Sequence, residues 1–232
     1  MIGARPLTHA ERSFDEAFDG AFRILGDTRG KRLLEAGCGG SGWLPYFARR
    51  WGFRVSGIDY SSAGCASAES LAQRAGVEAE IVCADFFAPP EQLLGAFDAV
   101  VSMGVVEHFA DTAAALNALA RLLRPGGVLV TEVPNMAGFN GTLQKLLRRR
   151  VYDIHVPLDA RALAAAHEAA GLRLIECRYL MSLNLAVVNA GRFSPVLAAL
   201  SRVAWLLERL TGRWPATRAL SPYVFAVAEL RQ

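Results

Sequence analysis

Between residues 32 and 133, short apolar segments alternate with helical segments, and this alternation is the strongest constraint on the fold. The apolar segments are rich in β-branched residues and apolar on both faces, which is typical of parallel strands covered by helices. Such an alternation predicts a doubly wound α/β sheet with right-handed crossovers. The expected strands are 32–36, 54–58, 79–84, 97–102 and 128–133, and the expected helices between them are 43–51, 63–75 and 112–123.

The segments outside this region are expected to add helices and two more strands. Thr8 and Glu11 form a capping-box pattern at the start of a helix that runs to Gly26, with aromatic residues at helical spacing toward the sheet. A tight turn at 124–127 is expected to end one helix and start the next strand. The later elements are expected to be helices over 136–150, 159–171 and 193–210, and strands over 172–177 and 223–230.

Charge and composition limit the kinds of partner. The 232 residues suit one α/β domain, and a net charge of +3 is too small for the dense basic face of a nucleic-acid-binding protein. The four cysteines form no C-x-x-C pair, which fits reduced thiols in a cytoplasm. The sequence contains neither a signal-peptide pattern nor an apolar stretch of about 20 residues. We therefore expect a cytoplasmic protein without nucleic acid and without stable membrane insertion.

The first expected strand is followed by a glycine-rich turn that opens a helix, with the sequence Glu35-Ala-Gly37-Cys38-Gly39-Gly-Ser-Gly42. Glycines permit positive φ and a close approach of the backbone to a ligand, and the helix start presents free amides. The spacing of the first, second and last of these glycines also fits the dinucleotide fingerprint. An NAD(P)-dependent oxidoreductase therefore remains an alternative.

Three acids stand at the carboxyl ends of successive expected strands: Glu35, Asp59 and Asp85. Asp59 can accept hydrogen bonds from both hydroxyls of a ribose, in either kind of nucleotide cofactor. Asp85 can accept a bond from an adenine amino group while Phe86 covers the ring. Glu35 stands where a dinucleotide enzyme usually has an apolar residue, and a carboxylate there suits a cationic cofactor. The pattern favours a positively charged nucleoside without phosphate.

Five motifs in register carry a resemblance to a known family, namely Glu35-Ala-Gly-Cys-Gly39, Gly57-Ile-Asp-Tyr-Ser61, Ala84-Asp-Phe86, Phe97–His108 and Leu123-Arg-Pro-Gly-Gly127. Together they resemble the class I S-adenosylmethionine-dependent methyltransferases, nearest the quinone-biosynthesis and natural-product tailoring enzymes. The resemblance implies a mostly parallel, Rossmann-like sheet of seven strands with the last strand antiparallel. It also implies S-adenosylmethionine as cofactor, bound at the switch point between the first and fourth strands.

Position by position, the resemblance implies cofactor contacts from Glu35, Gly37, Cys38, Gly39, Asp59, Tyr60, Asp85, Phe86, Ser102 and Met103. The last glycine of the turn stands one residue later than in the family's usual Gly-x-Gly-x-Gly. Gly37 and Gly39 are therefore the expected glycine contacts, and Gly42 is equally compatible with close packing of helix on strand.

His108, His155 and Tyr152 are the candidates for the methyl-acceptor side. An imidazole titrates near neutrality, so either histidine could remove a proton from the acceptor. His155 and Tyr152 fall in a segment that borders the acceptor in the family that the chain resembles, and both are expected to contact substrate. Residues 102–104 are not the Asn/Asp-Pro-Pro-Tyr arrangement that holds an amide. No cluster of His, Cys or carboxylates shows ligand spacing, so no metal is expected.

We expect one methyltransferase domain, with a helical cap over 1–29, a cofactor-binding core over 30–135, an insert near the acceptor over 136–158 and the second half of the sheet over 159–232. The helix 193–210 is expected to pack on the core, or to serve as a lid, a dimer contact or a docking site. The expected function is methyl transfer to an oxygen or nitrogen of a small, fairly apolar metabolite, by a monomer or homodimer. The alternatives are the oxidoreductase, for which no Tyr-x-x-x-Lys pair is present, and a catalytically silent binding protein.

Overall fold

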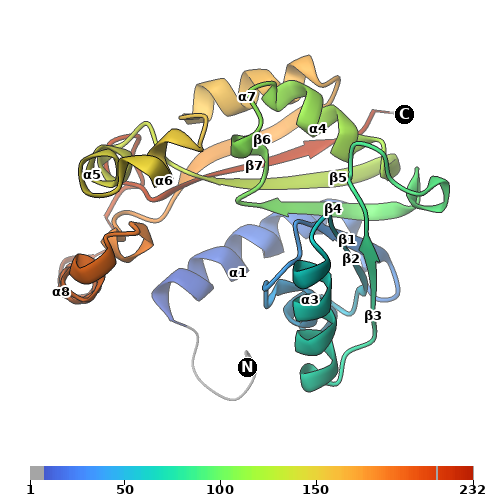
Figure 1. Cartoon of the computed structure of the whole chain (residues 1–232), viewed down its shortest axis with the longest axis horizontal. Helices are drawn as coiled ribbons and strands as arrows, with labels where there is room; N and C mark the ends of the chain where they lie inside the picture. Colours follow the sequence, from blue (N-terminus) through green and yellow to red (C-terminus); the bar gives the residue numbers. More distant parts are fainter. Residues whose placement is uncertain (1–7, 213, 232) are drawn as a thin grey trace.

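A seven-stranded mixed sheet forms the centre of the computed structural model, which describes residues 8–212 and 214–231. The strand order is β3-β2-β1-β4-β5-β7-β6 (Figure 1). Strands β1 to β5 are parallel, and β7 is antiparallel to both of its neighbours. The bounds are β1 (Arg32–Ala36), β2 (Arg54–Asp59), β3 (Ala79–Cys83), β4 (Phe97–Met103), β5 (Leu123–Pro134), β6 (Arg173–Leu180) and β7 (Tyr223–Glu229). The doubly wound topology and the antiparallel last strand are thus confirmed.

Helices cover both faces of this sheet (Figure 1). One face is covered by α4 (Thr112–Ala120) and α7 (Ala160–Ala169). The other face is covered by α1 (His9–Phe22), α2 (Trp43–Trp51) and α3 (Ser62–Ala75). Three further helices gather beyond the carboxyl ends of β5 and β6, namely α5 (Phe139–Leu147), α6 (Arg149–Asp153) and α8 (Ser194–Thr211). The described helices include none whose length and apolar character would let it cross a bilayer.

Helix α1 begins and packs as its sequence predicts. The Thr8 hydroxyl accepts the N–H of Glu11 at 3.3 Å, and the Glu11 carboxylate accepts the N–H of Thr8 at 2.8 Å. Phe18 is fully buried, with its ring centre 4.9 Å from that of Phe47 in α2 and 5.8 Å from that of Phe225 in β7. Helix α1 therefore closes one face of the sheet over β7 and α2.

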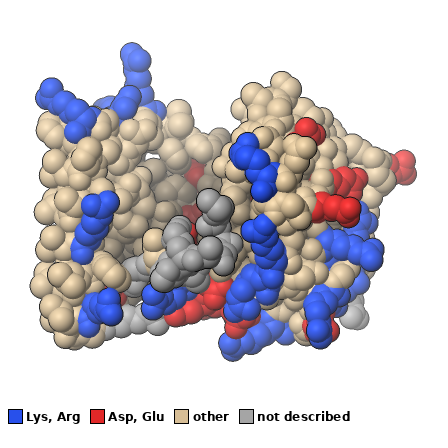
Figure 2. Space-filling view, turned by 90° about the horizontal axis from the view of Figure 1, so that it is seen from below, with Lys and Arg blue, Asp and Glu red and all other residues tan. Residues whose placement is uncertain are grey.

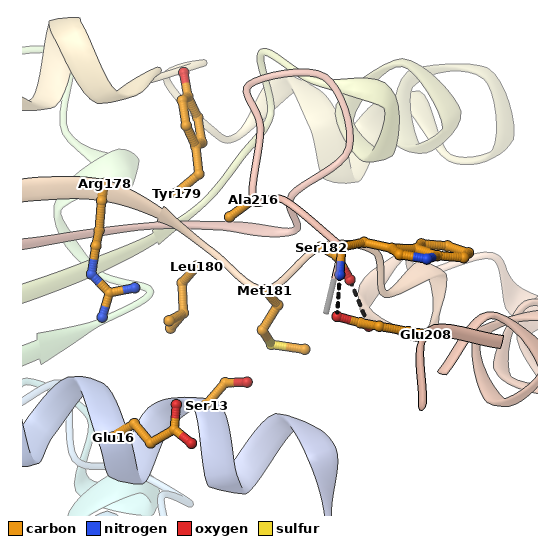
Figure 3. A pocket seen from close by; sticks show the side chains of 10 residues that line it. Ser13, Glu16, Arg178, Tyr179, Leu180, Met181, Ser182, Glu208 and Ala216 are labelled. Atoms are coloured by element: carbon orange, nitrogen blue, oxygen red, sulfur yellow. Dashed lines mark hydrogen bonds between the residues drawn. The ribbon is translucent and has the colours of Figure 1, made fainter. Parts of the chain in front are cut away.

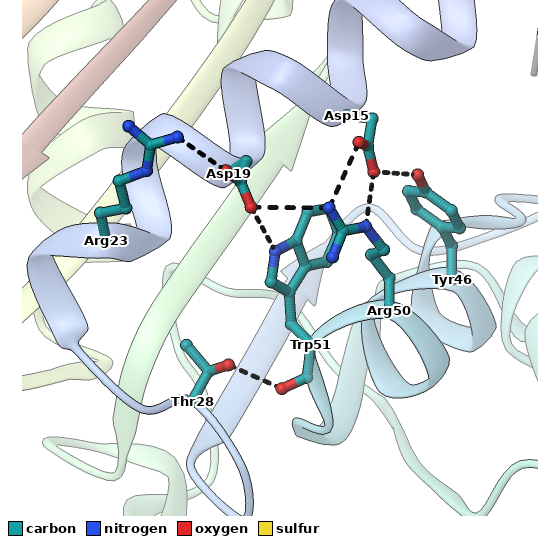
Figure 4. A network of polar contacts seen from close by, with 7 residues as sticks. All are labelled: Asp15, Asp19, Arg23, Thr28, Tyr46, Arg50 and Trp51. Atoms are coloured by element: carbon teal, nitrogen blue, oxygen red, sulfur yellow. Dashed lines mark hydrogen bonds and ion pairs between the residues drawn. The ribbon is translucent and has the colours of Figure 1, made fainter.

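Two aspartates of α1 also hold α2 through polar contacts (Figure 4). Asp15 accepts hydrogen bonds from the Tyr46 hydroxyl and, at 3.0 Å, from Nε of Arg50. Asp19 accepts the indole N–H of Trp51 at 3.4 Å and lies 3.6 Å from the Arg50 guanidinium. Because α2 starts at the glycine-rich turn, these contacts fix the position of that turn relative to α1.

Replacing Thr8 with alanine is expected to lower the free energy of unfolding by about 1 kcal/mol, because it leaves a helix N–H without its capping acceptor. Urea unfolding of the whole chain measures the change. Ser62→Ala, at an exposed first position of α3, is the matched control and should stay within about 0.5 kcal/mol of the wild type. Equal effects of the two substitutions would contradict the role of the cap.

Several boundaries differ from the sequence-based expectation. Helix α4 ends at Ala120, and β5 begins at Leu123, which pairs with Phe97 before a register shift. The turn at 124–127 belongs to the strand, because main-chain bonds join it to Leu230 at two points. The helix expected over 136–150 is two helices, since Arg148 departs from helical geometry with φ −149° and ψ 76°. Strand β6 continues to residue 180 because it pairs with β7 over that length.

Candidate active site

The glycine-rich turn leaves β1 and lies against the end of β2. Gly37 has a φ of +71°, and its N–H donates to the Ile58 carbonyl at 2.8 Å. The N–H of Gly39 donates to Oδ2 of Asp59 at 2.9 Å. A Cβ atom at Gly39 would lie 2.7 Å from that oxygen and 2.8 Å from the Cα of Gly64. Because a side chain does not fit at this position, only main-chain atoms of residue 39 face the sheet edge where a nucleoside binds in folds of this class.

Asp59 and Asp85 lie at the ends of neighbouring strands, as the sequence predicts. Asp59 ends β2, and its Oδ1 accepts the N–H of Ser61 at 2.9 Å. Strand β3 ends at Cys83, which pairs with Asp59. Asp85 follows two residues later, and its Oδ1 accepts the N–H of Phe87 at 2.9 Å. The two carboxylates therefore stand at the same edge of the sheet as the glycine-rich turn.

Glu35 has a different environment from the other two acids. It lies in β1 beneath the turn, is 1% exposed and accepts a hydrogen bond from the Ser41 hydroxyl at 2.5 Å. Its Oε2 atom has no hydrogen-bond partner within residues 8–212 and 214–231. Burial raises the pKa of Glu35 to about 8, against the smaller opposing effect of the Ser41 bond. The free chain therefore holds this group mainly protonated at neutral pH, and its charge toward a bound cofactor stays a prediction.

The other expected cofactor contacts differ in solvent exposure, and some of them are buried while others are accessible. Cys38 and Ser102 are fully buried, so neither is accessible to a ligand in this conformation. The Sγ atom of Cys38 packs against Gly57, and Ser102 lies in β4, which pairs with β1 on one side and β5 on the other. Their contact with a cofactor stays a prediction. Met103 is half-buried and Tyr60 is 84% exposed, so both remain accessible candidates.

Two aromatic rings that follow β3 lie against a third, Phe109, which follows η3. Phe86, expected to cover an adenine ring, is buried; its ring centre lies 4.6 Å from that of Phe87 and 5.5 Å from that of Phe109. Phe87 is 36% exposed and has the more accessible face. Sequence reasoning missed Phe87, although the adjacent pair of phenylalanines was a signal for it. A base that approaches this edge would therefore meet Phe87 more readily than Phe86.

The structure brings together His108 and His155, which are far apart in the sequence. His108 lies in the 3-10 turn η3 (Val106–His108), directly after Val105, whose side chain packs on the glycine-rich turn at Gly37. His155 follows α6. The two imidazole ring centres are 4.6 Å apart. Both histidines selected from the sequence therefore belong to one group beside the turn.

Two buried acids accompany this histidine pair, and sequence reasoning selected neither. Glu107 precedes His108, and its carbonyl accepts the N–H of Val156 at 2.7 Å, which ties the two histidine-bearing segments together. In the part of the chain that the structure describes, Glu107 and Glu132 each keep one carboxylate oxygen without a hydrogen-bond partner. Burial raises the pKa of both groups, and at Glu132 the charge of Glu107 adds to that shift. In the sequence, Glu132 could have been noticed as the one acidic residue within the apolar segment 128–133.

Glu107, His108 and His155 each present one ligand atom, and these atoms lie within 4.8 Å of one another. The spacing of the residues along the chain did not reveal this grouping, and the expectation that no metal binds stays untested by it. Tyr152, the other acceptor-side candidate, lies in α6 with the Lys145 ammonium 5.3 Å from its ring centre. Its contact with a substrate stays a prediction.

A cavity of about 360 Å³ lies at the carboxyl end of β6, between α1 and α8 (Figure 3). At one side of it, Glu208 accepts the Ser182 hydroxyl at 2.8 Å and the N–H of Trp214 at 3.1 Å. The face seen in Figure 2 is hollowed between its two halves. The cavity lies at β6, whereas the glycine-rich turn follows β1. Three strands of the sheet (β4, β5 and β7) stand between them, so the cavity is distinct from the nucleoside edge.

Comparison with known proteins gives matches over most of the chain. The family model described as a methyltransferase domain matches residues 9–177. The ubiquinone biosynthesis O-methyltransferase of Alkalilimnicola ehrlichii is 37% identical over 117 residues, which are 49% of this chain and 45% of that protein. The chain thus spans about half the length of the curated relatives that it matches.

Two solved structures share the fold at low sequence identity. The [4+2]-cyclase SpnF has a TM-score of 0.65 and 19% identity, over 98% of this chain and 84% of that one. The phosphoethanolamine N-methyltransferase 2 of Haemonchus contortus, in complex with S-adenosyl-L-methionine, has a TM-score of 0.62 and 16% identity, over 94% and 53%. Together with the strand order and the glycine-rich turn beside Asp59, the family match shows that the chain belongs to the methyltransferase domain family, among the class I S-adenosylmethionine-dependent methyltransferases.

Proposed function

We propose that this protein transfers the methyl group of S-adenosylmethionine to an oxygen or nitrogen atom of a small, fairly apolar metabolite. The observation that carries the proposal is the bare backbone of Gly39, bonded to Asp59 at the sheet edge that also holds Asp85. The turn over 35–42 has no basic side chain for a pyrophosphate. The name of the curated relatives, ubiquinone biosynthesis O-methyltransferase, favours an oxygen atom of a quinone-like acceptor.

The residues present fit this cofactor. In the proposal the backbone at Gly37 and Gly39 makes room for the nucleoside, Asp59 accepts its ribose hydroxyls and Asp85 accepts the adenine amino group. Glu35 loses its proton as it meets the positive charge of the amino acid part. When bound, the cofactor supplies a methyl carbon that its sulfonium has already activated. The remaining task of the chain is to align the acceptor and exclude water.

The acceptor side is assigned to the segment over 136–158, with His155 and Tyr152, and to His108. Nδ1–H of His108 donates to the Ile154 carbonyl at 3.0 Å, and Nδ1–H of His155 donates to the Val151 carbonyl at 2.6 Å. Nε2 of each ring can therefore accept a proton from an acceptor hydroxyl. In this proposal residues 30–135 bind the cofactor, and the helical cap over 1–29 bounds the acceptor side.

A methyl-transfer assay with a panel of catechols, phenols and amines tests the proposal, with products followed by mass spectrometry. We expect one acceptor class to gain a methyl group while S-adenosylhomocysteine accumulates, and Asp59→Ala to abolish the product. A chain that binds S-adenosylhomocysteine but methylates no acceptor would favour the binding function without turnover. Oxidation of NAD(P)H in place of methyl transfer would favour the oxidoreductase.

A further inference from the structure

Three side chains beside the glycine-rich turn form a group with the composition of a metal site. The atoms that Glu107, His108 and His155 present lie within 4.8 Å of one another. Oε1 of Glu107 is 3.9 Å from Nε2 of His108, which is too long for a hydrogen bond. It is close to the separation of about 3.4 Å between two ligands of one tetrahedral ion with bonds of about 2.1 Å.

Hydrogen bonds to the main chain hold both imidazoles in the form that binds metals. The Nδ1 atoms of His108 and His155 bond to the carbonyls of Ile154 and Val151, and a carbonyl can only accept. Each Nδ1 therefore carries the proton, and each Nε2 offers a lone pair. Metal-binding histidines are commonly oriented by such a bond from the second ring nitrogen to a carbonyl.

The Glu107 carboxylate lacks the donor that a buried acid normally has. The residue is 1% exposed, and Oε2 has no hydrogen-bond partner among the described residues. Buried polar atoms are almost always satisfied, so this carboxylate and two imidazole lone pairs beside it indicate a missing positive partner. We propose that Glu107, His108 and His155 together bind one divalent transition-metal ion.

The ligand chemistry selects the class of ion. Two imidazole nitrogens and one carboxylate suit zinc, manganese, iron(II) or cobalt, whereas calcium and magnesium prefer ligand sets made only of oxygen. Three protein ligands leave at least one coordination position open. Val105, which packs on Gly37, precedes Glu107 by two residues, so the ion lies close to the proposed cofactor edge. If the proposed function holds, the open position would take an oxygen of the methyl acceptor. The ion would then occupy both Nε2 lone pairs, so the ion rather than a histidine would activate the acceptor hydroxyl.

Cobalt(II) titration of the untagged whole chain, followed by visible absorption and equilibrium dialysis, tests the proposal without any turnover. We expect one ion per chain and ligand-field bands without a thiolate charge-transfer band, because exposed Cys83 lies outside the group. Glu107→Gln, His108→Gln and His155→Gln should each weaken binding by at least about tenfold. Asp153→Asn, which removes an exposed carboxylate paired with Arg149, is the matched control and should bind like the wild type.

Titration with S-adenosylhomocysteine and circular dichroism on the same variants separate this site from the cofactor site. The proposal predicts folded variants that bind the nucleoside as the wild type does and have lost the ion. A folded wild-type chain that retains no cobalt overturns it, and so does a Glu107→Gln variant with wild-type affinity for cobalt. Neither result would affect the proposed methyl transfer, which the acceptor assay tests independently.

Discussion

Alanine at position 39 is expected to lower the affinity for S-adenosylhomocysteine on the order of 100-fold, because a small displacement of the turn misplaces the cofactor. The added Cβ would lie 2.7 Å from Oδ2 of Asp59 and 2.8 Å from the Cα of Gly64. The second neighbour is backbone at the start of α3, so the turn itself must move. That movement also breaks the bond from the Gly39 N–H to Asp59. Calorimetric titration of the variant measures the loss.

Gly42→Ala is the matched control for this substitution. A Cβ atom at Gly42 would meet none of the described atoms within 4 Å, and the φ of −94° at this position is open to any residue. We expect its affinity for the nucleoside to remain close to that of the wild type, although it lies in the same turn. If Gly39→Ala and Gly42→Ala bind S-adenosylhomocysteine equally well, the turn does not approach the cofactor as proposed.

Glu35→Gln is expected to weaken cofactor binding while it stabilises the free chain at alkaline pH. The pKa of Glu35 is raised by burial to about 8, above its ordinary value of 4.5. The folded state therefore binds the proton more tightly than the unfolded state. The resulting stabilisation is complete below pH 4.5 and is lost as the pH rises from there through about 8, on the order of 5 kcal/mol in all. Glutamine cannot ionise and keeps its stability over this window.

Urea unfolding of the wild type and of Glu35→Gln between pH 6 and pH 9 measures this difference. The other buried acids contribute equally to the pH dependence of both proteins, so their contributions cancel in the comparison. The variant should lose affinity for S-adenosylmethionine by about 10- to 100-fold, the usual effect of a hydrogen bond to a charged group. In the wild type, binding below pH 8 should release a proton, which calorimetry detects as a heat that depends on the buffer. Parallel stability curves, or binding without proton release, would contradict the assignment of Glu35.

The sequence predicted the topology of the sheet and the location of its nucleoside edge, because both follow from local patterns. The alternation of apolar and helical segments defines the strands, and each acid at a strand end is visible in the linear sequence. The turn at 124–127 was misjudged because its pairing with Leu230 depends on a strand from the other end of the chain. Long-range pairing of this kind leaves no local signal.

The chemistry of individual site residues was less predictable, since it depends on three-dimensional burial. Glu35 looks like any charged acid in the sequence, yet its position beneath the turn removes it from water and raises its pKa. Ser102 falls in a motif, yet it is fully buried in the central strand β4. The group of Glu107, His108 and His155 forms only when the segment after α6 folds back against η3.

Calorimetric titration of the wild-type chain with S-adenosylhomocysteine, beside a parallel titration with NADPH, determines which nucleoside the glycine-rich turn binds. We expect one S-adenosylhomocysteine per chain, no heat from NADPH and a marked loss of affinity in Asp59→Asn. A chain with intact circular dichroism that does not bind S-adenosylhomocysteine, or that binds NADPH in its place, would contradict the assignment of this edge to S-adenosylmethionine.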